Sequence, residues 1–270
     1  MARDLDALRG ALSERRLNYF GNSYGTVYGQ AYAELFGHRV GRMYLDSVFD
    51  HTNPDLADWV RPGAVTAERN LHRMAAWCAE DPSCALHGQD VLAVWDSRSA
   101  DPTVLNWVAA RIGNDRSWPA ITTGLAQGVT PGPSPTDFRL ARTALCQDFA
   151  FPDDFPSLKR VENDLRAVAP RIGWAVQPWR VSGHCSGLPR ATANPPAPLR
   201  TGVRPVLVAN GENDPLTPAT HGRRVAAQLR AAYLPTAGNH GLYLRGNACV
   251  RDHVHRYLWT GALPHRDARC

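Results

Sequence analysis

The sequence predicts an α/β fold in which a parallel sheet is interrupted by a large helical insertion, and three observations carry that prediction. Short apolar, strand-like runs lie near the start of the chain, each followed by a helix-like segment. The same alternation returns near the end of the chain, and it is typical of strands joined by crossover helices. The long middle region instead shows short helical patterns separated by Pro and Gly.

The first informative element is a strand-like run, 17–20, that enters the motif Gly21-Asn22-Ser23-Tyr24-Gly25. A helix-like segment, 26–36, follows at once. Gly-x-Ser-x-Gly between a strand and a helix is typical of a nucleophile elbow, the sharp turn that presents a catalytic serine. We therefore predict Ser23 as a nucleophile and the Tyr24 backbone N–H as an oxyanion donor. The alternative is a chance match in a loop, since the motif is short.

The glycines around the motif have a steric reason. Strand and helix approach closely at such an elbow, so we expect Gly21 and Gly25 to be positions where a side chain does not fit. Gly29 lies one turn further along the same helical face.

A serine nucleophile needs a base and an acid that orients the base. The buried-type strand 204–210 ends in a turn that carries Glu212 and Asp214. Thr217 and Pro218 then read as the N-cap and first residue of the next helix. Because open α/β sheets build sites at the carboxyl ends of their strands, we predict Asp214 as the orienting acid.

The predicted base follows the next strand-like run, 231–234, which leads into Gly238-Asn239-His240-Gly241. The other histidines have weaker contexts: His253 and His255 fall in a helical pattern, and His221 is expected to be solvated in a first helical turn. The order Ser23, Asp214, His240 matches the chain order of α/β-hydrolase triads.

Alternatives to the acid stay open. Asp214 can be read as an ordinary turn aspartate, since Asn-Asp-Pro clusters form turns. Glu212 lies two residues earlier, and Asp46 and Asp50 follow the apolar run 43–45, which is the end of another strand.

Two blocks of sequence resemble one known family. The first, residues 2–50, includes LNYFGNSYGTVYGQAYAELFGHRVGRMYLDSVFD; the second includes PVLVANGENDPLTPATHGRRVAAQL and AGNHGLYLRGNACVRDHVHRYLWTGALP. Both resemble the secreted tripeptidyl aminopeptidases of the α/β-hydrolase superfamily, relatives of the prolyl aminopeptidases. The resemblance implies a serine exopeptidase that removes short peptides from free N-termini, with Ser23 as nucleophile, Asp214 as acid and His240 as base.

The resemblance extends to the six cysteines. Pairing neighbours along the sequence gives Cys78–Cys84, Cys146–Cys185 and Cys249–Cys270, as in the resembled family. An even number of locally paired cysteines favours disulfides and an exported protein. Free buried thiols are one alternative. Zinc is another, although the one close ligand pair, His184-Cys185, suits a tetrahedral site poorly.

The domain organisation follows from the strands. We expect residues 1–50 and 203–270 to form an α/β-hydrolase core, and residues 51–202 to form a helical cap with its return linker, 189–200. In the first segment we expect a helix with Leu5, Leu8 and Leu12 on one face. Seven of the eight tryptophans lie in the insertion, where most should build its own core: Trp59, Trp77, Trp95, Trp107, Trp118, Trp174 and Trp179.

Composition excludes other classes of protein. The net charge is +5, but the basic residues are scattered arginines with Lys159 as the single lysine, so we expect no nucleic acid partner. No apolar run approaches the roughly 18 residues of a membrane span. We expect a peptide or a small ester or amide as substrate, no cofactor and no metal.

The position of the elbow adds one expectation. Only 22 residues precede Ser23, whereas the resembled fold has four strands and a His-Gly-Gly-type oxyanion loop before its elbow. We therefore expect an N-terminally truncated sheet with one oxyanion donor. A silent remnant or binding module, or an esterase on the same scaffold, are the alternative functions.

Overall fold

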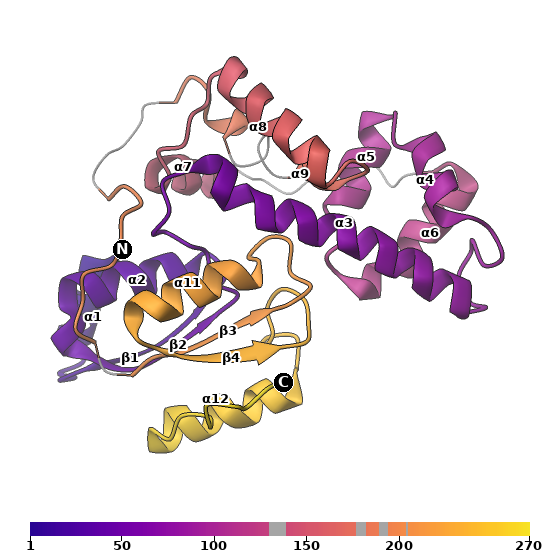
Figure 1. Ribbon diagram of the computed structural model, residues 1–270. Helices are drawn as coiled ribbons and strands as arrows, with labels where there is room; N and C mark the ends of the chain where they lie inside the picture. Colours follow the sequence, from indigo (N-terminus) through magenta and orange to yellow (C-terminus); the bar gives the residue numbers. More distant parts are fainter. Residues whose placement is uncertain (130–138, 177–181, 189–193, 204) are drawn as a thin grey trace. The chain divides into compact units, whose positions relative to one another are not determined.

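Among the described residues, four parallel strands form one sheet, in the order β1-β2-β3-β4. The computed structural model, shown in Figure 1, describes residues 1–270 except 130–138, 177–181, 189–193 and 204. The strands are β1 (Leu17–Asn22), β2 (Val40–Asp46), β3 (Leu207–Gly211) and β4 (Ala232–Thr236). The expected sheet is present, and strands distant in sequence, β2 and β3, lie side by side.

Helices cover both faces of this sheet, as Figure 1 shows. They are α1 (Ala2–Ala11), α2 (Gly25–Phe36), α11 (Ala219–Leu229) and α12 (Ala248–Thr260), with a short 3₁₀ turn, Gly37–Arg39, after α2. Helices α1, α2 and α11 pack on one face and α12 packs on the other. This is the layered arrangement of a parallel α/β sheet.

The central strands are apolar because both of their faces are covered. Side chains alternate along β2, so Met43 and Leu45 join the α2/α11 side while Tyr44 joins the α12 side. All three residues are fully buried. On α1, by contrast, Leu5 packs on the core whereas Leu8 and Leu12 are exposed, so the expected apolar face is only partly used.

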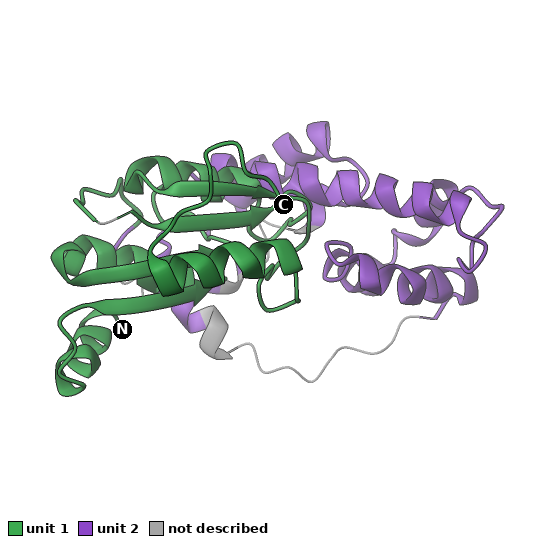
Figure 2. Cartoon of the chain, turned by 90° about the horizontal axis from the view of Figure 1, so that it is seen from below, with its two compact units in different colours: residues 1–53, 196–270 green, residues 54–195 purple. Residues whose placement is uncertain are grey.

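The chain divides into two compact units, coloured in Figure 2: residues 1–53 with 196–270, and residues 54–195. Residues close to the two boundaries form hydrogen bonds within the first unit. The Ala197 N–H donates to the His51 carbonyl oxygen at 3.2 Å, and the Gln228 side chain donates to Thr52 Oγ1 at 2.9 Å. These bonds hold residues 51, 52 and 197 in the first unit.

Helices are the only regular secondary structure in the described residues of the second unit. Its α-helices are α3 (Leu56–Glu80), α4 (Val91–Arg98), α5 (Pro102–Ala109), α6 (Trp118–Gln127), α7 (Arg139–Asp148), α8 (Phe155–Val168) and α9 (Gly173–Val176), with 3₁₀ turns at Asp115–Ser117 and Gly183–Cys185. The expectation of short helices is wrong for α3, which has 25 residues and contains Pro62.

Tryptophans build the core of this second unit. Trp95, Trp107 and Trp118 belong to one buried cluster, and Trp59 packs against Phe149 at a ring-centroid distance of 5.5 Å. Trp179 lies outside the described residues. A buried carboxylate, Glu68 on α3, accepts the backbone N–H groups of residues 171–173 and so ties α9 to α3.

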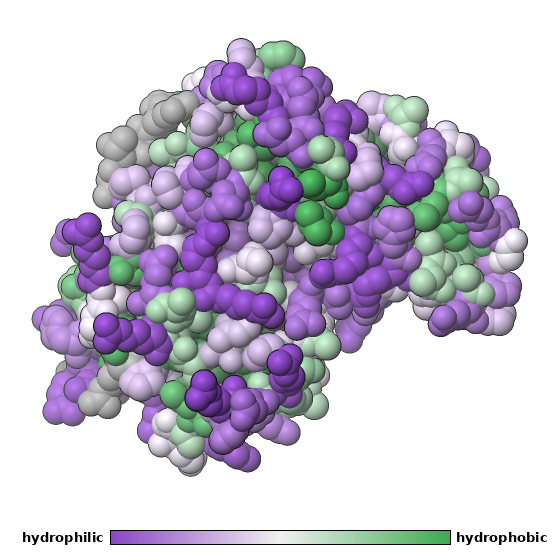
Figure 3. Space-filling view, in the orientation of Figure 1, coloured by the Kyte–Doolittle hydropathy of each residue, from purple (hydrophilic) through white to green (hydrophobic). Residues whose placement is uncertain are grey.

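Three disulfides fix the described chain covalently: Cys78–Cys84, Cys146–Cys185 and Cys249–Cys270. Such bonds are typical of oxidising compartments. Hydrophilic side chains are spread over the face drawn in Figure 3. Among the described helices, none combines the length and apolarity needed to cross a membrane.

Candidate active site

Ser23 lies at the turn between β1 and α2, in a backbone conformation that L-residues seldom adopt. Its φ is +54°, in the left-handed region. The Ser23 N–H donates to the carbonyl oxygen of Asp46, at the end of the adjacent strand, over 2.9 Å. Thr26 bonds back to the Ser23 carbonyl through both its N–H and its hydroxyl. The turn is therefore held from the sheet side and from the helix side.

Close packing around the elbow explains two of its three glycines. A Cβ on Gly21 would lie 2.8 Å from the Gly25 carbonyl oxygen, and one on Gly29 would lie 2.7 Å from Leu45 Cδ2. At Gly25 the nearest atom would be 3.6 Å away, an ordinary contact, so the expectation that a side chain is excluded there is wrong. The close approach occurs one turn later, at Gly29.

Tyr19 fastens the start of α2 to β1. Its hydroxyl donates to the Gly25 carbonyl oxygen at 2.6 Å, and burial raises the pKa of this hydroxyl to about 12. The tyrosine therefore stays a neutral donor at any physiological pH. Tyr24, directly after the serine, is the N-cap of α2, so its backbone N–H lies at the positive end of the helix dipole.

Asp214 and His240 are joined directly. The His240 Nδ1 lies 2.8 Å from Asp214 Oδ2, and the Asp214 side chain is fully buried. The other carboxylate oxygen, Oδ1, accepts the backbone N–H groups of Leu216 and Thr217 at 2.9 and 3.1 Å. Backbone N–H groups of the same turn thus hold the Asp214 carboxylate independently of the imidazole.

The loops that carry these two residues are bonded to each other. The Glu212 N–H donates to the Thr236 carbonyl oxygen and the Asn213 N–H donates to that of Gly238. At the start of the first loop, a Cβ on Gly211 would lie 2.4 Å from the Gly238 carbonyl oxygen. Only a glycine allows the backbones to approach this closely, so the acid loop and the histidine loop form one piece.

Thr217 has contacts that the sequence did not reveal. Helix α11 begins after Pro218, its N-cap, so the expectation that Thr217 caps this helix is wrong. Instead, the Thr217 hydroxyl hydrogen-bonds Asp214 Oδ2 and lies 3.1 Å from His240 Nδ1. The Asn210 side chain, at the end of β3, holds the Thr217 carbonyl oxygen at 2.9 Å.

The charges around His240 favour its protonated form. Burial by itself lowers the pKa of the imidazole, but the carboxylates of Asp214 and Asp46 outweigh burial and the opposing charge of Arg245. The pKa of His240 is therefore raised above its ordinary value. A more basic imidazole is a stronger proton acceptor.

The histidine loop meets the elbow at the end of β2. Asp46, whose carbonyl oxygen holds the Ser23 N–H, accepts the N–H groups of Leu242 and Tyr243 on its carboxylate. A Cβ on Gly241 would lie 3.9 Å from Asn22 Nδ2. The structure thus brings the segments of Ser23, Asp214 and His240 to the same edge of the sheet.

The competing acids have other partners. Asp50 accepts hydrogen bonds from Thr52 and pairs with Arg224 at 3.1 Å. Glu212 is half-exposed and lies 3.9 Å from Arg223. Asp46 bonds backbone groups after His240, whereas Asp214 bonds the imidazole itself.

Three other histidines were considered above: His253 and His255 lie on α12, and His221 lies on α11. His221 is buried on α11, so the expectation that it is solvated is wrong. His255 bonds the Tyr243 hydroxyl through Nε2 at 2.8 Å. The donor atoms of Cys249, His253 and Cys270 lie within 4.8 Å of one another, but both sulfurs are consumed by the Cys249–Cys270 disulfide.

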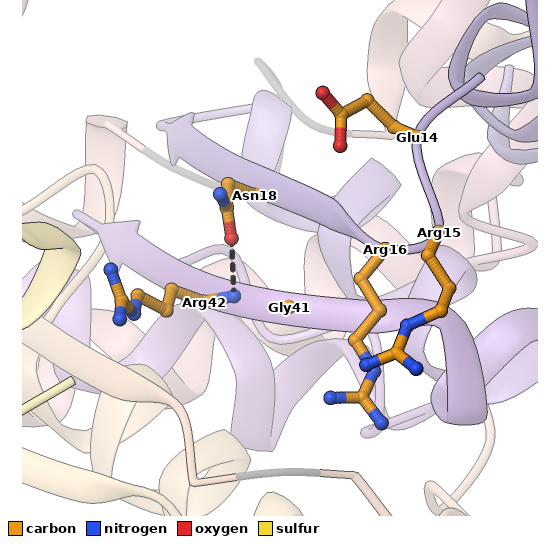
Figure 4. Close-up of a pocket in the computed structure, with 6 residues that line it drawn as sticks. All are labelled: Glu14, Arg15, Arg16, Asn18, Gly41 and Arg42. Atoms are coloured by element: carbon orange, nitrogen blue, oxygen red, sulfur yellow. Dashed lines mark hydrogen bonds between the residues drawn. The ribbon is translucent and has the colours of Figure 1, made fainter. Parts of the chain in front are cut away.

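A cavity of about 360 Å³ lies at the opposite, amino-terminal ends of β1 and β2. Figure 4 shows its lining: Glu14, Arg15, Arg16, Asn18, Gly41 and Arg42. The Arg42 side chain points away from the other two arginines and donates to the carbonyl oxygens of Leu258 and Trp259. Because Arg42 caps the end of α12, the three guanidinium groups do not converge on one ligand.

Comparisons with known proteins give a consistent set of relatives. The family model described as TAP-like protein matches residues 174–270, which include Asp214 and His240. Over the whole chain, the serine protease Hip1 of Mycobacterium tuberculosis is 28% identical and the tripeptidyl aminopeptidase of Streptomyces coelicolor is 29% identical. Carboxylesterase B of M. tuberculosis is also 28% identical over the whole chain.

The chain spans about three-fifths of the length of these relatives, 61%, 57% and 59% respectively. Among solved structures, a hydrolase from Pseudomonas aeruginosa PA01 is 20% identical, with 96% of this chain and 71% of that chain covered and a TM-score of 0.40.

Proposed function

We propose that this chain is a serine peptidase of the tripeptidyl aminopeptidase family of α/β-hydrolases and that it releases short peptides from free N-termini. The TAP-like family model and the whole-chain similarity to the peptidase relatives support this proposal. Ser23 is the nucleophile, His240 the base and Asp214 the acid that orients it. The observation that carries this proposal is the 2.8 Å bond from His240 Nδ1 to Asp214. The loop that carries His240 is also hydrogen-bonded to Asp46, which in turn holds the strained turn of Ser23.

The proposed acylation step uses the two ends of the imidazole differently. With Nδ1 held by Asp214, the Nε2 atom is the end that takes the proton of Ser23 Oγ. The oxygen forms a bond to the substrate carbonyl carbon, and the π electrons move to the carbonyl oxygen. The Tyr24 N–H, at the start of α2, stabilises that developing negative charge.

The tetrahedral intermediate then collapses. The C–N bond breaks, the leaving amine takes the proton from His240 Nε2, and the N-terminal fragment remains on Ser23 as an ester. Water repeats the sequence: His240 takes its proton, the water oxygen bonds to the acyl carbon, and Ser23 Oγ leaves with the proton. In each half-reaction, His240 takes one proton and then gives it away, while Asp214 holds the ring.

The class of substrate rests on the relatives. The Streptomyces relative is named for tripeptidyl aminopeptidase activity and a mycobacterial relative for serine protease activity. A third relative is named carboxylesterase B at the same level of identity, which keeps esters as the second candidate. A catalytically silent chain that only binds ligands is the remaining alternative. The three disulfides support export to an oxidising compartment.

The test compares three substrates on the disulfide-bonded protein: a tripeptide anilide with a free N-terminus, the same anilide acetylated, and a short-chain nitrophenyl ester. We expect hydrolysis of the free anilide to be favoured and Ser23→Ala to lower it by more than about 1,000-fold. Ser13→Ala is the matched control, because Ser13 has a nearly identical φ of +55° away from the elbow.

Other outcomes select the alternatives. Equal cleavage of blocked and free anilides removes the aminopeptidase assignment, and cleavage of the ester alone selects the esterase. If Ser23 also fails to react with a fluorophosphonate probe, the chain is catalytically silent and the proposed function is wrong.

A further inference from the structure

The dipeptide Asp46-Ser47 at the end of β2 is bonded to both of its neighbouring strands. The Asp46 carbonyl oxygen accepts the Ser23 N–H at 2.9 Å, and the Ser47 N–H donates to the Ala209 carbonyl oxygen at 2.9 Å. Both side chains are fully buried. The dipeptide therefore has a fixed position relative to the elbow on one side and to β3 on the other.

The side chains of the same dipeptide hold the backbone directly after His240. Ser47 Oγ accepts the Gly241 N–H at 2.7 Å. Asp46 Oδ1 accepts the Leu242 N–H at 3.1 Å, and Oδ2 accepts the Tyr243 N–H at 2.8 Å. The side chains of Asp46 and Ser47 thus accept hydrogen bonds from three consecutive backbone N–H groups, those of residues 241–243.

The conformation of Ser47 explains how two neighbouring side chains reach the same loop. Its φ is +55°, so the extended alternation of β2 ends at this residue. Ser47 Oγ also donates to Asp46 Oδ1 at 2.9 Å, which links the two side chains. A left-handed serine costs stability compared with glycine, and the hydroxyl that it supplies has two partners here.

We propose that Asp46 and Ser47 are positioning residues that set His240 against Ser23. This inference rests on the proposed function. Asp214 orients the ring through Nδ1, while Asp46 and Ser47 fix the backbone that carries the ring. Because the same Asp46 also binds the Ser23 N–H, a shift of the histidine loop relative to the nucleophile requires breaking bonds to a buried carboxylate.

The electrostatic surroundings agree with this division. Asp214, Asp46 and Arg245 are the charged groups that act on His240, and the Asp46 charge raises the pKa of the imidazole. Around Asp46 the titratable groups are His240 and Tyr44. Burial raises the pKa of the Asp46 carboxyl, although the hydrogen bonds from Tyr243, Ser47 and Leu242 oppose this shift.

Two variants separate the charge from the geometry. Asp46→Asn keeps the shape but removes the charge and one acceptor oxygen. Ser47→Gly removes the acceptor for the Gly241 N–H, and glycine adopts the positive φ without strain. Asp50→Asn is the matched control, since Asp50 is a buried carboxylate four residues later whose bonds go to Thr52 and Arg224.

The measurements are kcat and KM for the best substrate, and the pKa of His240 by NMR titration, assigned with a His240→Gln variant. We expect Asp46→Asn to lower the pKa of His240 by about half a unit or more. We also expect it to lower kcat about 10- to 100-fold, with KM within roughly twofold. Ser47→Gly should lower kcat in the same way while leaving the pKa of His240 in place.

The proposal is overturned if Asp46→Asn leaves both the pKa of His240 and kcat at the values of Asp50→Asn. It is also overturned if Asp50→Asn reproduces both changes, because any buried carboxylate would then suffice. Should the unmodified protein neither hydrolyse substrates nor react with the fluorophosphonate probe, the proposed function fails. The His240 titrations of the three variants still decide whether Asp46 acts on the imidazole.

Discussion

Thr217 Oγ1 lies 3.1 Å from His240 Nδ1, and its hydroxyl also hydrogen-bonds the carboxylate of Asp214. The threonine therefore contacts both members of the proposed acid–base pair from the segment directly before α11. Its backbone is held as well, because its N–H donates to Asp214 Oδ1 and its carbonyl oxygen accepts from Asn210.

Replacement of this hydroxyl should weaken catalysis. We expect Thr217→Val to lower kcat about tenfold, because a buried carboxylate loses a donor worth about 1 kcal/mol or more. Thr217→Ser keeps the hydroxyl and is expected to restore most of the rate. Steady-state kinetics on the two variants make the comparison, and equal rates for valine and serine would remove the hydroxyl from the site.

The positive φ of Ser23 predicts a conflict between stability and function. Glycine adopts φ +54° freely, whereas alanine pays about 1–2 kcal/mol in the left-handed region. We expect Ser23→Gly to be more stable than Ser23→Ala by about 1 kcal/mol, with both variants inactive.

Denaturant unfolding monitors this difference, and Ser13 supplies an internal standard because its φ is +55°. The same pair of substitutions at Ser13 should give a similar difference. A clear gain from glycine at Ser13 and none at Ser23 would contradict the strained elbow.

The pH dependence of the reaction follows from the raised pKa of His240. The base must be neutral, so activity should be lost as the pH falls through the pKa of His240, at a value above the ordinary 6.5. Asp214→Asn removes the carboxylate that favours the imidazolium, so the acid limb should move to lower pH while the rate falls.

Arg245 provides a control of opposite sign, because its charge lowers the pKa of His240. Arg245→Gln should move the acid limb slightly to higher pH; the shift is expected to be small, since Arg245 is exposed. The pH profile of kcat/KM, or of the rate of Ser23 phosphonylation, measures both. If the acid limb shifts in the same direction in both variants, the electrostatic explanation is wrong.

The packing of α2 on the sheet predicts different costs at two glycines. At Gly29 a methyl group meets Leu45 Cδ2 and Tyr19 Cε1 at 2.7 and 3.0 Å. We expect Gly29→Ala to destabilise the fold by about 1–3 kcal/mol through overpacking. Gly25→Ala, with its nearest contact at 3.6 Å, should cost less. Thermal unfolding of the two variants decides the point, and the reverse order would contradict the packing.

Local sequence was sufficient for much of the core. The elbow, its helix and the strands β3 and β4 follow from short patterns in which each residue depends on its neighbours along the chain. The same reasoning was wrong about Thr217, because its partners, Asp214 and His240, compete with the helix end for its hydroxyl. It was also wrong about Gly25, since the close contact is with Leu45 of another strand and occurs at Gly29.

The sequence by itself determined the order of strands and helices, the Gly-x-Ser-x-Gly turn, and the candidates Ser23, Asp214 and His240, because propensity, spacing and chain order are written in neighbouring residues. Only the tertiary structure decided what surrounds them. The bonds from Asp46 and Ser47 to residues 241–243 span almost 200 positions of the chain. Such contacts leave no periodic pattern, because they form only when parallel strands bring distant loops to one edge of the sheet.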